Sequence, residues 1–194
     1  MTHRPIKVII FFTITMFTSF SIGEQISQSQ ITRHQELTER ARAIVKQFAG
    51  ALKPQLQQAM QSGGPKKAVE VCSIQAQEIA DKISDQTGWR VKRVSLRARN
   101  SITAQPDSWE RTQLEFFDRA VTDKQNKLEA SKMDDYQFRY MKAQIVEPIC
   151  LTCHGKQISP DVLAVIKKHY KEDEATGYQL GDVRGAFSLS RWLE

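Results

Sequence analysis

The sequence is poor in cysteine and holds few side chains that bind metals. It has 3 cysteines and 4 histidines among 194 residues, and two of the cysteines lie in the stretch "EPICLTCHGKQ". So small and odd a number of cysteines does not indicate the disulfide framework of small secreted domains. A tetrahedral zinc site usually recruits a second closely spaced Cys/His pair, and the sequence has none.

Signatures of common enzymes and of nucleic-acid binding are also missing. The chain has no Ser-His-Asp pattern, no carboxylate dyad, no glycine-rich phosphate loop, no repeats and no low-complexity segment. Its formal charge of +6 falls to +4 without Arg4 and Lys7, and no basic patch is interleaved with aromatic residues. We therefore expect neither an enzyme nor a protein that binds nucleic acid.

The chemistry that is present centres on Cys150, Cys153 and His154, which are spaced C-x-x-C-H. A thioredoxin-like pair would require a βαβ setting, and nothing around Gly155 indicates one. In covalent haem attachment, two thiols form thioethers with the porphyrin and the adjacent histidine ligates the iron. The alternative is a structural disulfide followed by an incidental histidine. We expect one covalent haem c, with Cys150 and Cys153 as attachment residues and His154 as iron ligand.

The N-terminal stretch "MTHRPIKVIIFFTITMFTSFSIGEQ" has the basic, apolar and small-residue regions of a secretory signal peptide. Its apolar run of about 15 residues is shorter than the roughly 20 needed to span a bilayer. An uncleaved membrane anchor is the alternative. We expect a signal peptide at 1–23 and a single periplasmic domain at 24–194, which contacts a membrane only through the export signal. Because bacterial c-type haem is attached outside the cytoplasm, we also expect the cytochrome c maturation machinery as a partner.

Hydrophobic periodicity predicts an α+β fold in which an antiparallel sheet is flanked by long N-terminal helices. Pro54 is expected to kink or divide the first helix, and Asp107 with Glu110 forms a capping-box pattern at a later helix start. The expected helices cover about 31–60, 65–86, 107–121 and 159–170. The expected strands cover 89–99, 136–146 and 181–192.

Four motifs in this order give the chain a family resemblance: "AVEVCSIQAQEIA", "VKRVSLRARNS…QPDSWE", "EPICLTCHG" and "GYQLGDVRGAFSLS". They resemble a bacterial family of exported c-type haem proteins with a PAS-like fold, once catalogued only as a domain of unknown function. The resemblance runs from about Arg33 to Trp192. It implies a PAS-like haem domain that senses redox state or a small molecule, no established catalysis, and an axial cysteine at the position of Cys72.

The sixth iron ligand has several candidates in the sequence. His34 and His169 lie in charged, solvated settings, and Met141 is typical of core filling. Cys72 is a lone thiol on an apolar helix face, where it is either a small buried side chain or, as the resemblance implies, the ligand.

Arginines of the first expected strand are candidates to pair with haem propionates, since guanidinium binds carboxylate bidentately. Arg93, Arg97 and Arg99 share one face of that strand by alternation, and a solvated face is the equal alternative. We expect Arg93 and Arg97 to bind the cofactor. Sensing through His/Cys-ligated haem, with a redox or signalling protein partner, is the leading expectation. A soluble electron carrier is the alternative, and a haem enzyme such as a peroxidase is the weakest.

Overall fold

The computed structural model describes residues 22–122 and 128–193. The chain divides into two units, Met1–Arg33 and His34–Glu194. Within the first unit, the described residues form the opening turns of helix α1. The expected signal peptide lies almost wholly outside the described residues. None of the described helices contains an apolar stretch that could cross a membrane.

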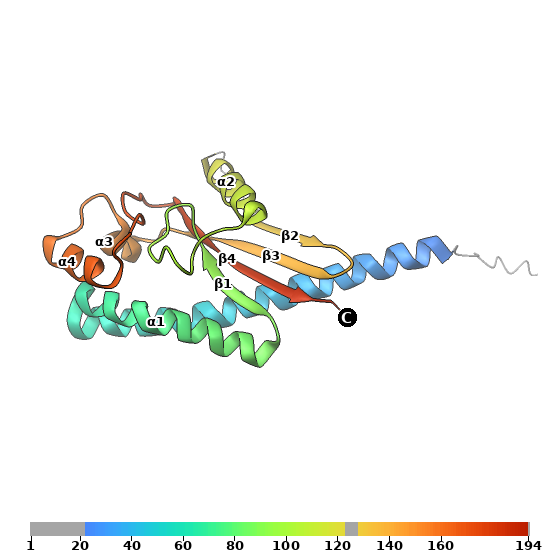
Figure 1. Cartoon of the computed structure of the whole chain (residues 1–194), viewed down its shortest axis with the longest axis horizontal. Helices are drawn as coiled ribbons and strands as arrows, with labels where there is room; N and C mark the ends of the chain where they lie inside the picture. Colours follow the sequence, from blue (N-terminus) through green and yellow to red (C-terminus); the bar gives the residue numbers. More distant parts are fainter. Residues whose placement is uncertain (1–21, 123–127, 194) are drawn as a thin grey trace, which may run out of the picture. The chain divides into compact units, whose positions relative to one another are not determined.

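The second unit is an α+β domain built on one antiparallel sheet, as the sequence predicts (Figure 1). The sheet has four strands in the order β1-β4-β3-β2, so the first and last strands of the chain lie side by side. The elements are α1 (Ile22–Thr87), β1 (Arg90–Val94), α2 (Ser108–Thr122), β2 (Glu129–Met133), β3 (Gln137–Ile145), η1 (Pro148–Cys150), α3 (Leu151–His154), α4 (Pro160–His169) and β4 (Val183–Trp192).

Helix α1 is a hairpin of two helices that reverses direction at Gly64. The backbone there has φ 67° and ψ −163°, in a region that glycine enters without a steric penalty. Pro65 follows at the start of the second helix, where its missing N–H is not needed. Backbone angles at Pro54 remain helical. Of the two effects expected of Pro54, a kink or a division, the division is wrong, because the reversal occurs at the Gly63–Gly64 turn, in the gap expected between the first two helices.

Each face of the sheet is covered by helix. The α1 face buries apolar residues from both halves of the hairpin and from strands β1, β3 and β4: Leu37, Ala41, Ile44, Val45, Phe48, Ile79, Ala80, Ile83, Trp89, Val91, Phe138, Tyr140, Phe187 and Leu189. The other face packs against α2 through Val94, Leu114, Phe117, Met141, Val183 and Ala186. Both halves of α1 contact the same sheet face, and the second half does so through Ile79, Ala80 and Ile83 in its later turns. Cys72 lies two turns before these contacts and has Arg93, near the end of β1, and Arg184, at the start of β4, among its charged neighbours.

Strand β1 is shorter than the sequence predicts and ends at Val94. The Ser95 N–H then donates to the Ala104 carbonyl, 3.1 Å away, across a loop. In that loop the Asn100 side chain accepts the N–H groups of Ile102 and Thr103, at 3.1 and 3.2 Å. Such an Asx turn gives the backbone an alternative to pairing in the sheet. Strand β2 was not predicted, since its short polar sequence shows no hydrophobic alternation.

A buried carboxylate fixes α2 on the sheet. Glu110 is 0% exposed; it accepts hydrogen bonds from Lys92 Nζ at 2.9 Å and Ser188 Oγ at 2.5 Å. The predicted capping box is confirmed: Glu110 N donates to Asp107 Oδ1 at 2.9 Å, and Asp107 N to Glu110 Oε2 at 2.8 Å. Arg139 contacts both carboxylates, at 2.6 and 3.3 Å. One side chain thus joins the helix start to strands β1, β3 and β4.

Replacing Glu110 by alanine should strongly destabilise the domain. The substitution leaves Lys92 and Ser188 without their buried partner, and removal of one member of a buried ion pair costs about 3 kcal/mol. Glu115→Ala removes an exposed carboxylate of the same helix and should change stability by less than about 0.5 kcal/mol. Urea unfolding of both variants measures the difference. Equal stabilities would contradict the assignment of Glu110 as the anchor of α2.

Candidate functional site

The C-x-x-C-H segment forms one compact turn after β3, made of η1 and α3. Its backbone is tied to a later loop: Tyr178 N donates to the His154 carbonyl, and Gly177 N to the Gly155 carbonyl, both at 3.0 Å. Cys153 packs beside Val69, Val162 and Ile166, between α1 and α4. Cys150 packs with Val146, Ala175 and Tyr178. The two thiols therefore extend toward different walls of the same region.

All three cysteines lie in the described part of the chain and are free thiols. The structure therefore contains no disulfide between Cys150 and Cys153. Across residues 22–122 and 128–193, no three side chains of His, Cys, Asp or Glu converge in a metal-binding geometry. A structural zinc site would need four such ligands, whereas a haem iron takes four ligands from the porphyrin and only its axial ligands from the protein.

Gly155 is needed because the turn closes tightly on itself. Its N–H donates to the Leu151 carbonyl at 2.8 Å, and a Cβ at this position would lie 2.5 Å from the same oxygen. The obstructing atom belongs to the backbone, so it cannot move aside as a flexible side chain would. The glycine directly behind the motif thus allows α3 to end at His154 and the chain to turn toward Tyr178.

His154 is fixed in one tautomer by its surroundings. Its Nδ1 lies 2.7 Å from the Ala175 carbonyl oxygen, which can only accept, so Nδ1 carries the proton. The lone pair of the neutral ring is then on Nε2, the arrangement found in metal-bound histidines. Burial, together with the nearby charges of Arg184 and Arg99, holds the pKa of His154 well below its usual value. Tyr178 contacts the ring edge-on, with centroids 6.2 Å apart.

Arg99 holds the two sides of this turn together. Its Nη2 donates to the Cys153 carbonyl at 2.5 Å and to the Ala175 carbonyl at 3.1 Å. Its Nε donates to Asp173 Oδ1 at 3.1 Å, and the same oxygen accepts the Ala175 N–H at 2.9 Å. The carbonyl that orients His154 is therefore also bonded to a guanidinium.

Cys72 lies in the same region as His154, although 82 positions separate them in the sequence. It is half-buried on the second half of α1, and burial raises the pKa of its thiol. Arg93, Arg184 and Arg99 act in the opposite direction on this pKa, and the same three arginines lower the pKa of His154. Thiol and imidazole thus share one set of cationic neighbours, which come from β1, β4 and the loop after β1.

Two of these arginines lack carboxylate partners. In the described part of the chain, Arg93 makes no hydrogen bond or ion pair, and its guanidinium lies 5.7 Å from the Phe48 ring centroid. Among the described residues, the Arg184 side chain donates to the Gln144 amide oxygen, at 3.4 Å, and has no carboxylate partner. Burial lowers the pKa of Arg93 to about 10, and it also lowers the pKa of Arg184. Partly buried cations without counter-ions indicate a place for an anionic ligand.

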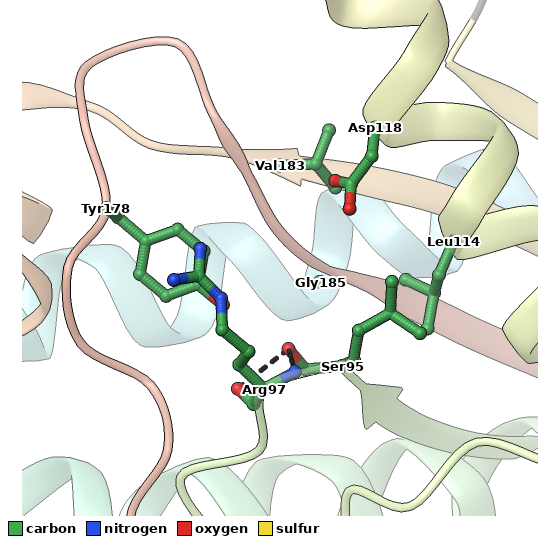
Figure 2. A pocket seen from close by; sticks show the side chains of 8 residues that line it. Ser95, Arg97, Leu114, Asp118, Tyr178, Val183 and Gly185 are labelled. Atoms are coloured by element: carbon green, nitrogen blue, oxygen red, sulfur yellow. Dashed lines mark hydrogen bonds between the residues drawn. The ribbon is translucent and has the colours of Figure 1, made fainter.

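Arg97, the other expected cofactor residue, lies apart from this cluster. Its guanidinium stacks on Tyr178, 3.8 Å from the ring centroid, and Nη1 donates to the Thr176 carbonyl at 3.0 Å. Figure 2 shows it at the edge of a small pocket on the α2 side, with Asp118 and Leu114 across from it. Because β1 ends at Val94, the alternation that grouped Arg97 with Arg93 does not continue.

The other candidate axial ligands lie elsewhere. His34 contacts Ser131 and the Phe138 ring on the α1 face of the sheet. His169 is exposed at the end of α4, and Met141 is fully buried beneath α2, where it fills the core. Sequence reasoning missed Arg184 and Tyr170, both neighbours of Cys72. Only the arginine had a signal in the sequence, since it lies in "GYQLGDVRGAFSLS", one of the four stretches that carry the family resemblance.

The chain belongs to the Tll0287-like family, whose description it matches over residues 24–191. Among solved structures it is similar to the cyanobacterial haem protein Tll0287, with a TM-score of 0.65 and 22% sequence identity. That match covers 82% of this chain and 96% of the other. At this identity the likeness shows the fold. No curated protein matches the chain.

The close packing of Gly155 gives a test with a built-in control. Gly155→Ala should destabilise the domain by about 2 kcal/mol, because the new methyl group forces the Leu151 carbonyl away. Gly50→Ala places a methyl in open space within α1 and should instead stabilise by about 0.5–1 kcal/mol. Thermal unfolding of both variants provides the comparison. A tolerated Gly155→Ala substitution would show that the turn is looser than described.

Proposed function

We propose that the chain is an exported mono-haem c-type protein of PAS-like fold that senses redox state or a small ligand. The observation that carries this proposal is that Cys72 and His154 have the same three arginines as charged neighbours. Only one of these arginines, Arg99, is paired with a carboxylate among the described residues. A haem has two propionates and an iron that takes two axial ligands. These requirements match the two unpaired guanidiniums of Arg93 and Arg184 and the two donors, His154 and Cys72.

Cys150 and Cys153 would hold the group covalently. Each thiol adds across one porphyrin vinyl group: the sulfur bonds to carbon, the thiol hydrogen goes to the neighbouring carbon, and no oxidant is consumed. The partly exposed positions of both cysteines suit access by the cytochrome c maturation machinery. Together with the N-terminal pattern at 1–23, this supports a periplasmic location.

His154 and Cys72 would be the axial ligands of the bound group. The Nδ1 hydrogen bond to Ala175 leaves Nε2 free to ligate. Burial keeps the Cys72 thiol protonated in the free chain, and a coordinating metal deprotonates such a thiol. Thiolate ligation supplies electron density to haem iron and lowers its reduction potential, which suits a sensor better than a carrier of high potential.

A soluble electron carrier is the second candidate. It is favoured by the partial exposure of the whole segment from Cys150 to His154 and by the exposed Lys156 two residues after it, since electron exchange requires the cofactor near the surface. The two roles differ in whether the reduced protein binds carbon monoxide. A sensor of small ligands would release one axial ligand and bind it, whereas a carrier would remain six-coordinate.

Covalent attachment should depend on both cysteines of the motif. Protein matured with a haem-attachment system should retain haem on a denaturing gel and through acid–acetone extraction. Cys150→Ala combined with Cys153→Ala should lose it, whereas Cys72→Ala should keep it because no thioether is removed. Haem that extracts freely from the wild-type protein would disprove c-type attachment.

Cys72→Ala should change the iron coordination while the haem remains attached. Loss of an axial thiolate should shift the Soret band and raise the reduction potential. The controls His169→Ala and His34→Ala alter histidines that lie away from the cluster and should leave both quantities nearly unchanged. Absorption spectra measure the Soret band of each variant, and potentiometry measures its reduction potential. An unaltered Cys72→Ala spectrum, with a large change in either histidine variant, would favour the electron carrier with two histidine ligands.

A further inference from the structure

The Ala175 carbonyl accepts two hydrogen bonds of different character. His154 Nδ1 donates to it at 2.7 Å and Arg99 Nη2 at 3.1 Å. A hydrogen bond from the second nitrogen of a ligating histidine normally raises the basicity of the ligand, because it pulls the Nδ1 proton toward the acceptor. Here the guanidinium draws on the same oxygen, so the carbonyl is a weaker acceptor for His154. The imidazole would then keep its proton and would donate less charge to a bound iron.

Asp173 sets how strongly Arg99 acts. Its Oδ1 accepts from Arg99 Nε at 3.1 Å and from Ala175 N at 2.9 Å. Both side chains are largely shielded, with 12% and 8% of their surfaces exposed, so solvent screens the pair weakly. The carboxylate offsets part of the arginine charge and fixes the loop that carries the carbonyl. The two residues therefore have opposite effects on one shared acceptor.

We propose that Arg99 and Asp173 are positioning residues that set the electron-donating strength of His154 through the Ala175 carbonyl: Arg99 weakens it and Asp173 restores it. This inference rests on the proposed function, since it requires His154 to ligate iron. It assigns to Arg99 a role different from that of Arg93 and Arg184, which remain without carboxylate partners in the described chain. If Arg99 and Asp173 only held the turn in place, removal of either side chain would loosen the same turn, and both variants would shift the midpoint potential in the same direction.

The test uses the full-length, haem-loaded protein and two variants that retain side-chain size, Arg99→Gln and Asp173→Asn. Arg99→Gln frees the carbonyl, strengthens the Nδ1 hydrogen bond and should lower the midpoint potential. Asp173→Asn leaves the guanidinium uncompensated and should raise it. Each shift should correspond to roughly a tenfold change in the redox equilibrium, or about 59 mV for one electron. Arg99→Lys keeps the charge and should retain most of the wild-type potential.

Two controls separate the shared hydrogen bond from charge alone. Lys171→Gln and Glu174→Gln remove one charge each from exposed positions on the loop that carries Asp173, and both should shift the potential much less. A second readout is the His154 Nδ1–H proton resonance of the reduced protein, which should move downfield in Arg99→Gln and upfield in Asp173→Asn. In each variant, a downfield shift of the Nδ1–H resonance should accompany a lower midpoint potential, and an upfield shift a higher one.

Shifts of the two variants in the same direction, or shifts no larger than those of the controls, would overturn the proposal. If Arg99→Gln fails to retain haem, Asp173→Asn decides alone: an unchanged or lowered potential contradicts the proposal. Failure of the proposed function is distinguishable, because wild-type protein would then carry no covalent haem or would keep its spectrum when His154 is replaced.

Discussion

The backbone of the C-x-x-C-H segment is bonded to the loop that follows α4, and the arrangement of the candidate site depends on this pairing. His154 and Gly155 accept N–H groups from Tyr178 and Gly177, while Nδ1 of His154 reaches the Ala175 carbonyl. Gly155 permits the approach because a side chain there would meet the Leu151 carbonyl. Without the pairing, the histidine would have neither a fixed tautomer nor a fixed direction. Cys150 would also lose the wall formed by Ala175 and Tyr178.

The sheet brings charge to this pairing from several directions. Arg93 comes from the end of β1, Arg184 from the start of β4 and Arg99 from the loop between β1 and α2. These guanidiniums are the charged neighbours of the half-buried Cys72 thiol and of the His154 imidazole. Among the described residues, Asp173 is the carboxylate bonded to one of them, Arg99. Such a concentration of like charge is unfavourable by itself, and a dianionic group bound beside it would offset the repulsion. This balance of charges supports the proposal that the site takes a ligand that carries carboxylates.

The sequence predicted those parts of the structure that depend on interactions between residues close in the chain. Asp107 and Glu110 were predicted as a capping box, and both reciprocal hydrogen bonds are present. The strand expected at 136–146 is β3, and the antiparallel α+β class is confirmed. Strand β2 could not be predicted, because its five residues, three of them polar, become a strand only by pairing with β3.

The C-x-x-C-H motif of the candidate site could be predicted from the sequence, whereas the arginines around it could be predicted only in part. The C-x-x-C-H spacing is enough to identify Cys150, Cys153 and His154, whereas Cys72 was chosen through the family resemblance. Arg93 joins them because β1 is regular up to Val94. Arg97 does not, since the chain leaves the sheet one residue after Val94, and periodicity alone gives no sign of that exit. Arg184 enters from the far end of the chain, through the pairing of β4 with β1 and β3.

The central claim is that the fold holds one haem iron between His154 and Cys72. X-ray absorption at the iron edge of the oxidised wild-type protein tests it most directly, because sulfur and nitrogen scatter differently in the first coordination shell. The account predicts one sulfur ligand together with the five nitrogens of porphyrin and histidine. A shell made only of nitrogen or oxygen ligands would contradict it.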